Sequence, residues 1–167
     1  WRDRDVRELG LDAVRVRRWF LKQHGMTFLA CSRARRLGGA FAALRGGERL
    51  DHVALDHGFE SHSGFRDAFS RWFGEPPGRA RRRDCIRFGW LESPLGPLLA
   101  AAVEEGVCLL EFSDRRMLEA QLRTLARRIR RPAVPGDHPH LDRLRRELAG
   151  YFAGRRLSFT VPLFAPG

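Results

Sequence analysis

Apolar residues recur at helical spacing through the first half of the chain, and one segment shows the pattern most clearly. Phe65, Phe69 and Phe73 follow one another at every fourth position, which predicts an amphipathic helix with one buried side. Ser61 can cap the start of this helix with its side-chain oxygen, and Gly74, followed closely by two prolines, ends it. The opposite side of the helix is polar and therefore free to contact a partner.

The first half is predicted to contain two similar units, each made of a short helix, a turn and a second helix. The predicted helices span 2–9 and 11–25 in the first unit, and 49–57 and 60–74 in the second. Val16 with Phe20 and Phe65 with Phe69 are the expected buried pairs of the second helices. A long helix from Phe28 to Leu44 lies between the units. The pattern thus predicts two helix-turn-helix units joined by a rigid rod.

The periodicity changes after the basic run "RARRRDC" (79–85), and the second half predicts both strands and helices. The expected strands are 86–92, 97–103 and 107–112, joined by turns as an antiparallel meander, and a last strand at 157–163. Two amphipathic helices, around Leu118–Ile129 and Leu141–Leu148, flank a proline-containing loop at 130–140. We therefore expect an all-α domain at 1–84 and a small α+β domain with an antiparallel sheet at 85–167.

Charge narrows the choice of partner. The formal net charge is +11, and of the 31 basic residues only Lys22 is a lysine. An excess of this size favours a polyanion, because arginine contacts to phosphates supply salt-dependent affinity. Nucleic acid is therefore the leading candidate partner.

Cysteines and hydropathy suggest a protein without a metal, a cofactor or a membrane span. The three cysteines are an odd number without CxxC spacing, which suggests neither a disulfide framework nor a zinc site and suits a reducing cytoplasm. No stretch reaches the ~20 continuous apolar residues of a membrane span, and no signal peptide opens the chain. Because the first residue is Trp1 rather than methionine, we expect an upstream segment.

In a helix-turn-helix unit the second helix enters the major groove, so exposed positions near its start are the candidate base readers. They are Val14, Arg15, Arg17 and Arg18 in the first unit and His62, Ser63 and Arg66 in the second. The candidate phosphate contacts lie later in each recognition helix or after it. They are Lys22 in the first unit and Arg71, Arg79 and Arg81 in the second. The alternative is that these side chains only solvate helix faces. Trp19 and Trp72 are interpreted as packing residues.

A family resemblance favours DNA binding. The stretch "VALDHGFESHSGFRDAFSRWFGEPPGRAR" (53–81) resembles the second unit of the AraC-type regulators. The matching positions are Ala54, Gly58, Phe59, Phe65, Phe69, Gly74 and Pro77. The first unit resembles that family through Phe20, Gly25 and the "RARRL" segment (33–37). The resemblance implies that both units bind double-stranded DNA, and we expect one monomer to do so.

The second half resembles a different family. It resembles the ribonuclease H-like part of the O6-methylguanine-DNA methyltransferases in the segments 93–122 and 144–167. The most specific match is "LLEFSDRRMLE" (109–119). Such a domain directly after an AraC-type domain resembles the Ada-type proteins. That resemblance implies a transcription activator of the adaptive response to DNA alkylation, joined to a DNA repair domain, with RNA polymerase as a second candidate partner.

The methyltransferase family accepts the alkyl group on the cysteine of a Pro-Cys-His-Arg motif, which does not occur in these 167 residues. Cys31, Cys85 and Cys108 have different neighbours and are interpreted as packing residues, so no catalytic residue is assigned. We interpret the chain as a piece of an Ada-type protein whose repair domain continues beyond Gly167. The competing hypothesis is an AraC-type regulator whose α+β domain senses a signal or holds a partner without catalysis.

Overall fold

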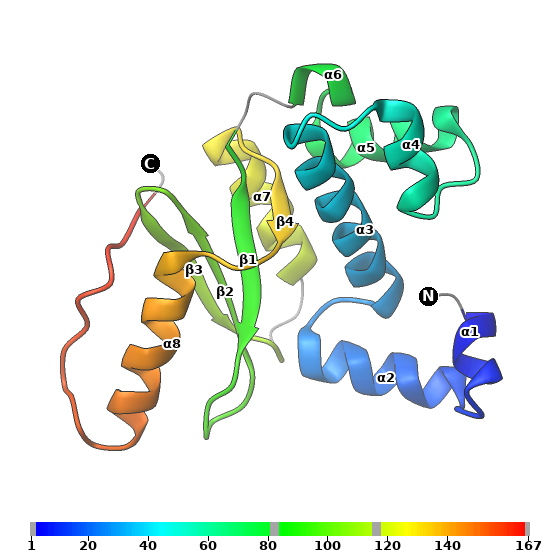
Figure 1. Ribbon diagram of the computed structural model, residues 1–167. Coiled ribbons are helices and arrows are strands. Elements are labelled where there is room, and N and C mark those ends of the chain that lie inside the picture. Colours follow the sequence, from blue (N-terminus) through cyan, green and yellow to red (C-terminus); the bar gives the residue numbers. More distant parts are fainter. Residues whose placement is uncertain (1–2, 81–83, 115–117, 166–167) are drawn as a thin grey trace.

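The computed structural model describes residues 3–80, 84–114 and 118–165, and its first part is helical (Figure 1). The helices are α1 (Asp3–Glu8), α2 (Ala13–His24), α3 (Phe28–Arg45), α4 (Leu50–Asp56), α5 (His62–Phe73) and α6 (Pro77–Ala80). The helices predicted for both units and for the rod are present, with small shifts at their ends. Helices α1 and α2 lie near the start of α3, and α4 to α6 lie near its end (Figure 1).

The described residues of the second part form four strands and two helices. They are β1 (Ile86–Leu91), β2 (Leu98–Val103), β3 (Gly106–Phe112), α7 (Leu118–Ile129), β4 (Ala133–Pro135) and α8 (Pro139–Phe152). The sheet order is β3-β2-β1-β4. The predicted meander is confirmed, because β1 pairs with β2 and β2 with β3 in antiparallel fashion.

The prediction of a purely antiparallel sheet is wrong, because β4 pairs with β1 in parallel. This strand lies inside the segment 130–140 that was predicted to be a loop. It has only three residues, and Pro132 and Pro135 enclose Ala133 and Val134, so no alternating apolar pattern can be seen. Prolines are tolerated there because β4 is an edge strand, which leaves one side of its backbone unpaired.

The last predicted strand, 157–163, is also wrong. Among the described residues this segment forms only one isolated bridge, between Val107 and Leu163. Its alternating apolar residues do not share a buried face: Val161 is buried, whereas Leu157 is 91% exposed and Leu163 is 78% exposed. The backbone N–H groups of Thr160 and Val161 donate to the carboxylate of Glu147 in α8, so a side chain takes the place of a neighbouring strand.

Helices cover both faces of the sheet. Leu141, Leu144 and Leu148 of α8 pack on one face (Figure 1). Leu118 and Leu122 of α7 pack on the other, in the same cluster as residues from the start of α3. Strand β2 lies in the interior of the sheet between these layers, and all six of its residues are buried. This burial explains its unbroken apolar sequence.

Helix α3 belongs to the cores of both parts of the chain. Its later residues Leu37 and Phe41 form a cluster with α4, α5 and Val134 of β4, whereas Ala34 packs with Ile86 and the sheet. A Cβ atom on Gly38 would lie 3.3 Å from the Cβ of Val134, so the absence of a side chain lets α3 approach β4 closely. The two parts are therefore in direct contact, and the domain boundary near residue 84 stays a prediction.

Candidate nucleic-acid interface

Helix α5 is fixed on one side and exposed on the other. Phe65, Phe69 and Phe73 are buried against α3 and α4, and the ring of Phe73 stacks on that of Phe41 at 5.2 Å between centroids. The predicted cap is confirmed, because the backbone N–H of Gly64 donates to Ser61 Oγ at 3.1 Å. Gly74 ends the helix with a φ of 73°, a conformation that strongly favours glycine. The remaining face of α5 is held toward solvent by this packing.

The turn between α4 and α5 is tied to the rod. A guanidinium nitrogen of Arg36 in α3 donates to the carbonyl of Gly58 at 3.1 Å. The same guanidinium lies over the ring of Phe59, 5.2 Å from its centroid. Arg36 belongs to the "RARRL" segment, so this motif has a structural role: it ties the turn of the second unit to α3.

The predicted base readers of α5 are all exposed, but two of them already have polar neighbours. Nδ1 of His62 lies 3.1 Å from Oδ1 of Asp51 in α4. Ser63 Oγ lies 3.3 Å from Ser61 Oγ, the cap of the helix. Arg66 has no ion-pair or hydrogen-bond partner among the residues that the structure describes. Of the three, it is therefore the side chain most available for a base.

Sequence reasoning missed the carboxylates near this face. Asp51 holds His62, and Asp67 is exposed on α5 next to Arg66. A carboxylate repels phosphates but can accept a hydrogen bond from the amino group of cytosine. No local sequence signal marks Asp51, because its contact with His62 depends on how α4 and α5 cross.

Helix α2 presents the first set of candidate readers. Asp12 caps the helix by accepting from the backbone N–H groups of Val14 and Arg15, and these bonds hold the pKa of Asp12 below its usual value. The predicted residues of this helix are all exposed: Val14, Arg15, Arg17, Arg18 and Lys22. Val16 and Phe20 were expected to form a buried pair, but both are only half-buried, and the only buried residue of α2 is Ala13. The first unit thus packs less tightly than the second.

The end of α2 is anchored to the sheet. The indole Nε1 of Trp90 in β1 donates to the carbonyl of His24 at 3.2 Å, and the two rings meet edge to face at 4.9 Å. Burial lowers the pKa of His24. A Cβ atom on Gly25 would lie 2.4 Å from the carbonyl oxygen of Ser113, so only glycine fits at this crossing. The first recognition helix is therefore positioned by the α+β part.

The predicted phosphate contacts do not form one cluster. Lys22 is exposed near the end of α2, whereas Arg71 and Arg79 are exposed on α5 and α6. Arg81 lies outside the described residues. With about 1.5 Å of rise per residue, the 18 residues of α3 span about 27 Å. The structure therefore keeps the candidates of the two units at opposite ends of α3 (Figure 1).

The three thiols lie in packed surroundings. Burial raises the pKa of Cys31 and Cys85, and it raises the pKa of Cys108 to about 11. A thiol with a raised pKa is a poor nucleophile near neutral pH because the thiolate is the reactive form. Within the described ranges, no three histidine, cysteine, aspartate or glutamate residues gather as a metal site. No described helix has the length and hydropathy needed to cross a membrane.

Comparison with known protein families gives two matches along the chain. Residues 6–83 match the family described as a helix-turn-helix domain, which is of the AraC type. Residues 86–165 match the family described as the 6-O-methylguanine DNA methyltransferase, ribonuclease-like domain. A comparison with curated proteins finds no match.

Proposed function

We propose that this chain regulates transcription in the adaptive response to DNA alkylation. It joins an AraC-type helix-turn-helix domain to the ribonuclease-like domain of 6-O-methylguanine DNA methyltransferase, in the order of the Ada-type fusion. Its DNA-binding part selects a sequence in duplex DNA. Its second part belongs to a repair protein that transfers methyl groups from DNA to a protein cysteine. The observation that carries the proposal is the exposed polar face of α5, held opposite three buried phenylalanines.

The geometry of α5 supports base reading. Its start is capped by Ser61 and its core face is fixed, so the exposed face can enter a major groove as a rigid body. Arg66 can pair through its guanidinium fork with the two acceptors of guanine, while Ser63 can bond to several bases. His62 reaches a base only by exchanging its contact with Asp51.

The first unit acts in the same way with a different set of side chains. Arg15, Arg17 and Arg18 follow directly on the Asp12 cap of α2 and are exposed. Lys22, Arg71, Arg79 and Arg81 serve as phosphate contacts, which position the protein without reading sequence. One monomer places both recognition helices on one duplex. RNA polymerase is the second partner of such an activator. The protein acts in the cytoplasm, where both DNA and RNA polymerase are present.

The chemistry of the cysteines favours a second proposal, in which the α+β part is not catalytic. The Pro-Cys-His-Arg motif is absent from these 167 residues, and burial raises the pKa of all three thiols. On this alternative, the α+β part is a non-catalytic domain that senses a signal or binds a partner. Both proposals share the DNA-binding role of the helical part.

The test of the shared role is selection of tight-binding duplexes from a random pool, followed by titration of the chain with a selected and a scrambled duplex at one salt concentration. A specific regulator binds its site ~10³-fold or more tightly than other DNA. The double variant R18A/R66A should lose most of that ratio while keeping salt-dependent binding. Equal affinity of the wild-type chain for both duplexes would overturn the proposal.

A further inference from the structure

A cleft of about 620 Å³ lies between the end of α5 and the length of α7, and its lining is strongly basic. Its lining arginines are Arg71, Arg123, Arg127, Arg130 and Arg131. Among the described residues that line it there is no aspartate or glutamate. The remaining lining residues include Trp72 and Phe73, which form an apolar wall. The cleft therefore combines several positive charges with surroundings that exclude part of the water.

Internal ion pairs satisfy only some of these arginines. Arg131 makes two hydrogen bonds of 2.7 Å to the carboxylate of Glu105. Arg123 lies 3.9 Å from Glu119, at an exposed position where such a pair contributes little. Arg127 donates to the hydroxyl of Thr124, and neither it nor Arg71 has a carboxylate partner among the described residues. An anion in the cleft would thus find Arg71 and Arg127 without a carboxylate partner among the described residues.

The spacing of the α7 arginines suits an extended anion. Arg123 and Arg127 are four positions apart on α7, which places them on one side of the helix, and Arg130 follows directly after the last helical residue, Ile129. With ~1.5 Å of rise per residue, Arg123 and Arg127 are about 6 Å apart along the helix axis. One strand of B-DNA carries a phosphate about every 3.4 Å along the axis, so two phosphates can lie along this pair. A single small anion would contact only part of it.

We infer that this cleft binds backbone phosphates of the duplex that α5 engages, so that the methyltransferase-like part acts as a second clamp on the DNA. Arg71 provides the link because it lies on the proposed recognition helix and also lines the cleft. Arginine suits this task because its planar fork donates two bonds to a phosphate. The inference rests on the proposed function and adds a DNA contact outside the helix-turn-helix units.

The cleft is held in place by the surrounding structure. Trp72 lines it and also donates its indole N–H to the carbonyl of Ala133 in β4 at 2.8 Å. On the other side, Leu118 and Leu122 bury α7 against the sheet. The arginines of α5 and α7 therefore line a cleft whose two sides are both fixed by packing, and the clamp needs no large rearrangement to accept a strand.

The test compares R123Q/R127Q with a matched pair, R146Q/R155Q, which removes the same charge from exposed positions in and just after α8. Binding of the full chain is measured from 50 to 200 mM salt on a selected duplex. The duplex is used in two lengths, one ending at the α5 segment and one extended past it. Circular dichroism and thermal unfolding show whether each variant keeps its fold.

On the extended duplex, R123Q/R127Q should lower the slope of log affinity against log salt by about 2, because each lost phosphate contact removes about 0.9. Over this salt range, the affinity of the wild type should therefore fall roughly tenfold more than that of the variant. On the short duplex, the two proteins should have equal slopes. The matched pair should behave as the wild type on both duplexes.

A wild-type slope for R123Q/R127Q on the extended duplex would overturn the inference and leave the proposed function standing. An equal loss of slope in both variant pairs would also overturn it, because the effect would then be one of net charge. If inorganic tripolyphosphate competes with the DNA and abolishes the difference in salt slope between the wild type and R123Q/R127Q, the cleft is supported as the anion site. If inorganic tripolyphosphate binds the wild type but the variant's DNA slope is unchanged, the cleft is a small-anion site and the inference is wrong. Failure of the wild type to prefer the selected duplex refutes the proposed function itself.

Discussion

The indole Nε1 of Trp72 in α5 donates a hydrogen bond of 2.8 Å to the backbone carbonyl of Ala133 in β4. Because β4 is an edge strand, this bond satisfies one carbonyl of an otherwise open edge. The same indole belongs to the packing around the cores of both parts of the chain. Trp72 is thus a packing residue, as its position beside the phenylalanine face suggested, and it also connects the second helix-turn-helix unit to the sheet.

Trp72→Phe should lower the free energy of unfolding by about 1 kcal/mol, since it keeps a ring but removes the hydrogen bond to Ala133. The measurement is urea unfolding of the full chain. Trp19→Phe is the control, because Trp19 is 59% exposed on α2 and should change stability by less than ~0.5 kcal/mol. An equal effect of the two substitutions would show that the bond does not stabilise the contact.

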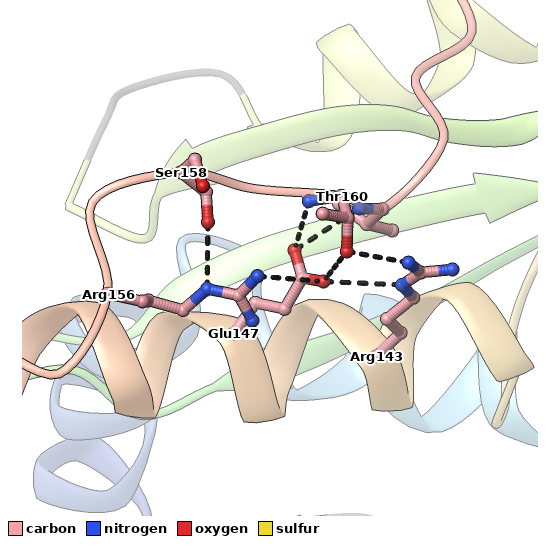
Figure 2. Close-up of polar contacts among 6 residues, drawn as sticks. Arg143, Glu147, Arg156, Ser158 and Thr160 are labelled. Atoms are coloured by element: carbon pink, nitrogen blue, oxygen red, sulfur yellow. Dashed lines mark hydrogen bonds and ion pairs between the residues drawn. The ribbon is translucent and has the colours of Figure 1, made fainter.

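Glu147 connects α8 to the segment that follows it (Figure 2). Its carboxylate accepts from the hydroxyl and backbone N–H of Thr160 and from the N–H of Val161, and it pairs with Arg143 and Arg156. The side chain is 4% exposed. The bond from the Thr160 hydroxyl is the largest of the causes that hold the pKa of Glu147 at about 2, below the 4.5 of an unperturbed glutamate.

A carboxylate with a lowered pKa in the folded state adds stability above pH 4.5, and this contribution is lost as the pH falls toward 2. Glu147→Gln should therefore be less stable than the wild type at pH 6, and the difference should shrink between pH 4.5 and pH 2. Chemical unfolding across this pH range measures it. Glu104→Gln, at an exposed position, serves as the control. Parallel curves for wild type and Glu147→Gln would refute the assignment.

Arg18→Ala and Arg66→Ala should each relax base preference at a different position of the DNA site, by about 1–3 kcal/mol if the contact is bidentate. Arg79→Ala should instead weaken binding to all sequences alike and reduce the salt slope by about 1. The measurement is a set of titrations with single-base variants of the selected duplex. The division into readers and phosphate contacts fails if the three variants lose equal affinity on selected and random DNA.

The chain itself should not dealkylate DNA. Alkyl transfer needs a cysteine with thiolate character, whereas burial raises the pKa of Cys108 to about 11 and also raises those of Cys31 and Cys85. The chain is incubated with duplex DNA carrying labelled O6-methylguanine, and label on protein is counted, with an active methyltransferase as the positive control. Stoichiometric label on any of the three cysteines would contradict this expectation and remove the reason for the non-catalytic alternative.

Most helices could be predicted because their signals are local. The every-fourth spacing of Phe65, Phe69 and Phe73, together with the cap at Ser61 and the stop at Gly74, defines α5 within a few positions of sequence. The three meander strands are likewise separated by turn residues. The exposed faces of α2 and α5 follow directly from these patterns, which is why the candidate readers are found on the surface.

Features that depend on distant contacts could not be predicted. Strand β4 exists because Val134 packs with α3 and α5, and its three residues carry no pattern of their own. The alternation in 157–163 resembles a strand, but Glu147 supplies the hydrogen-bond acceptors that a neighbouring strand would provide. The basic cleft was missed for the same reason, since Arg71 and Arg127 are far apart in sequence and meet only through the packing of α5 and α7 on the sheet.

The central claim is that one monomer engages a single duplex through both α2 and α5. Hydroxyl-radical footprinting of the full chain on a selected duplex tests it most directly. We predict two protected backbone segments, each flanking the major groove that one recognition helix enters, with centres about one helical turn, roughly 34 Å, apart. Protection of the first should be lost in Arg18→Ala and of the second in Arg66→Ala. One short protected segment that both substitutions abolish would contradict the claim.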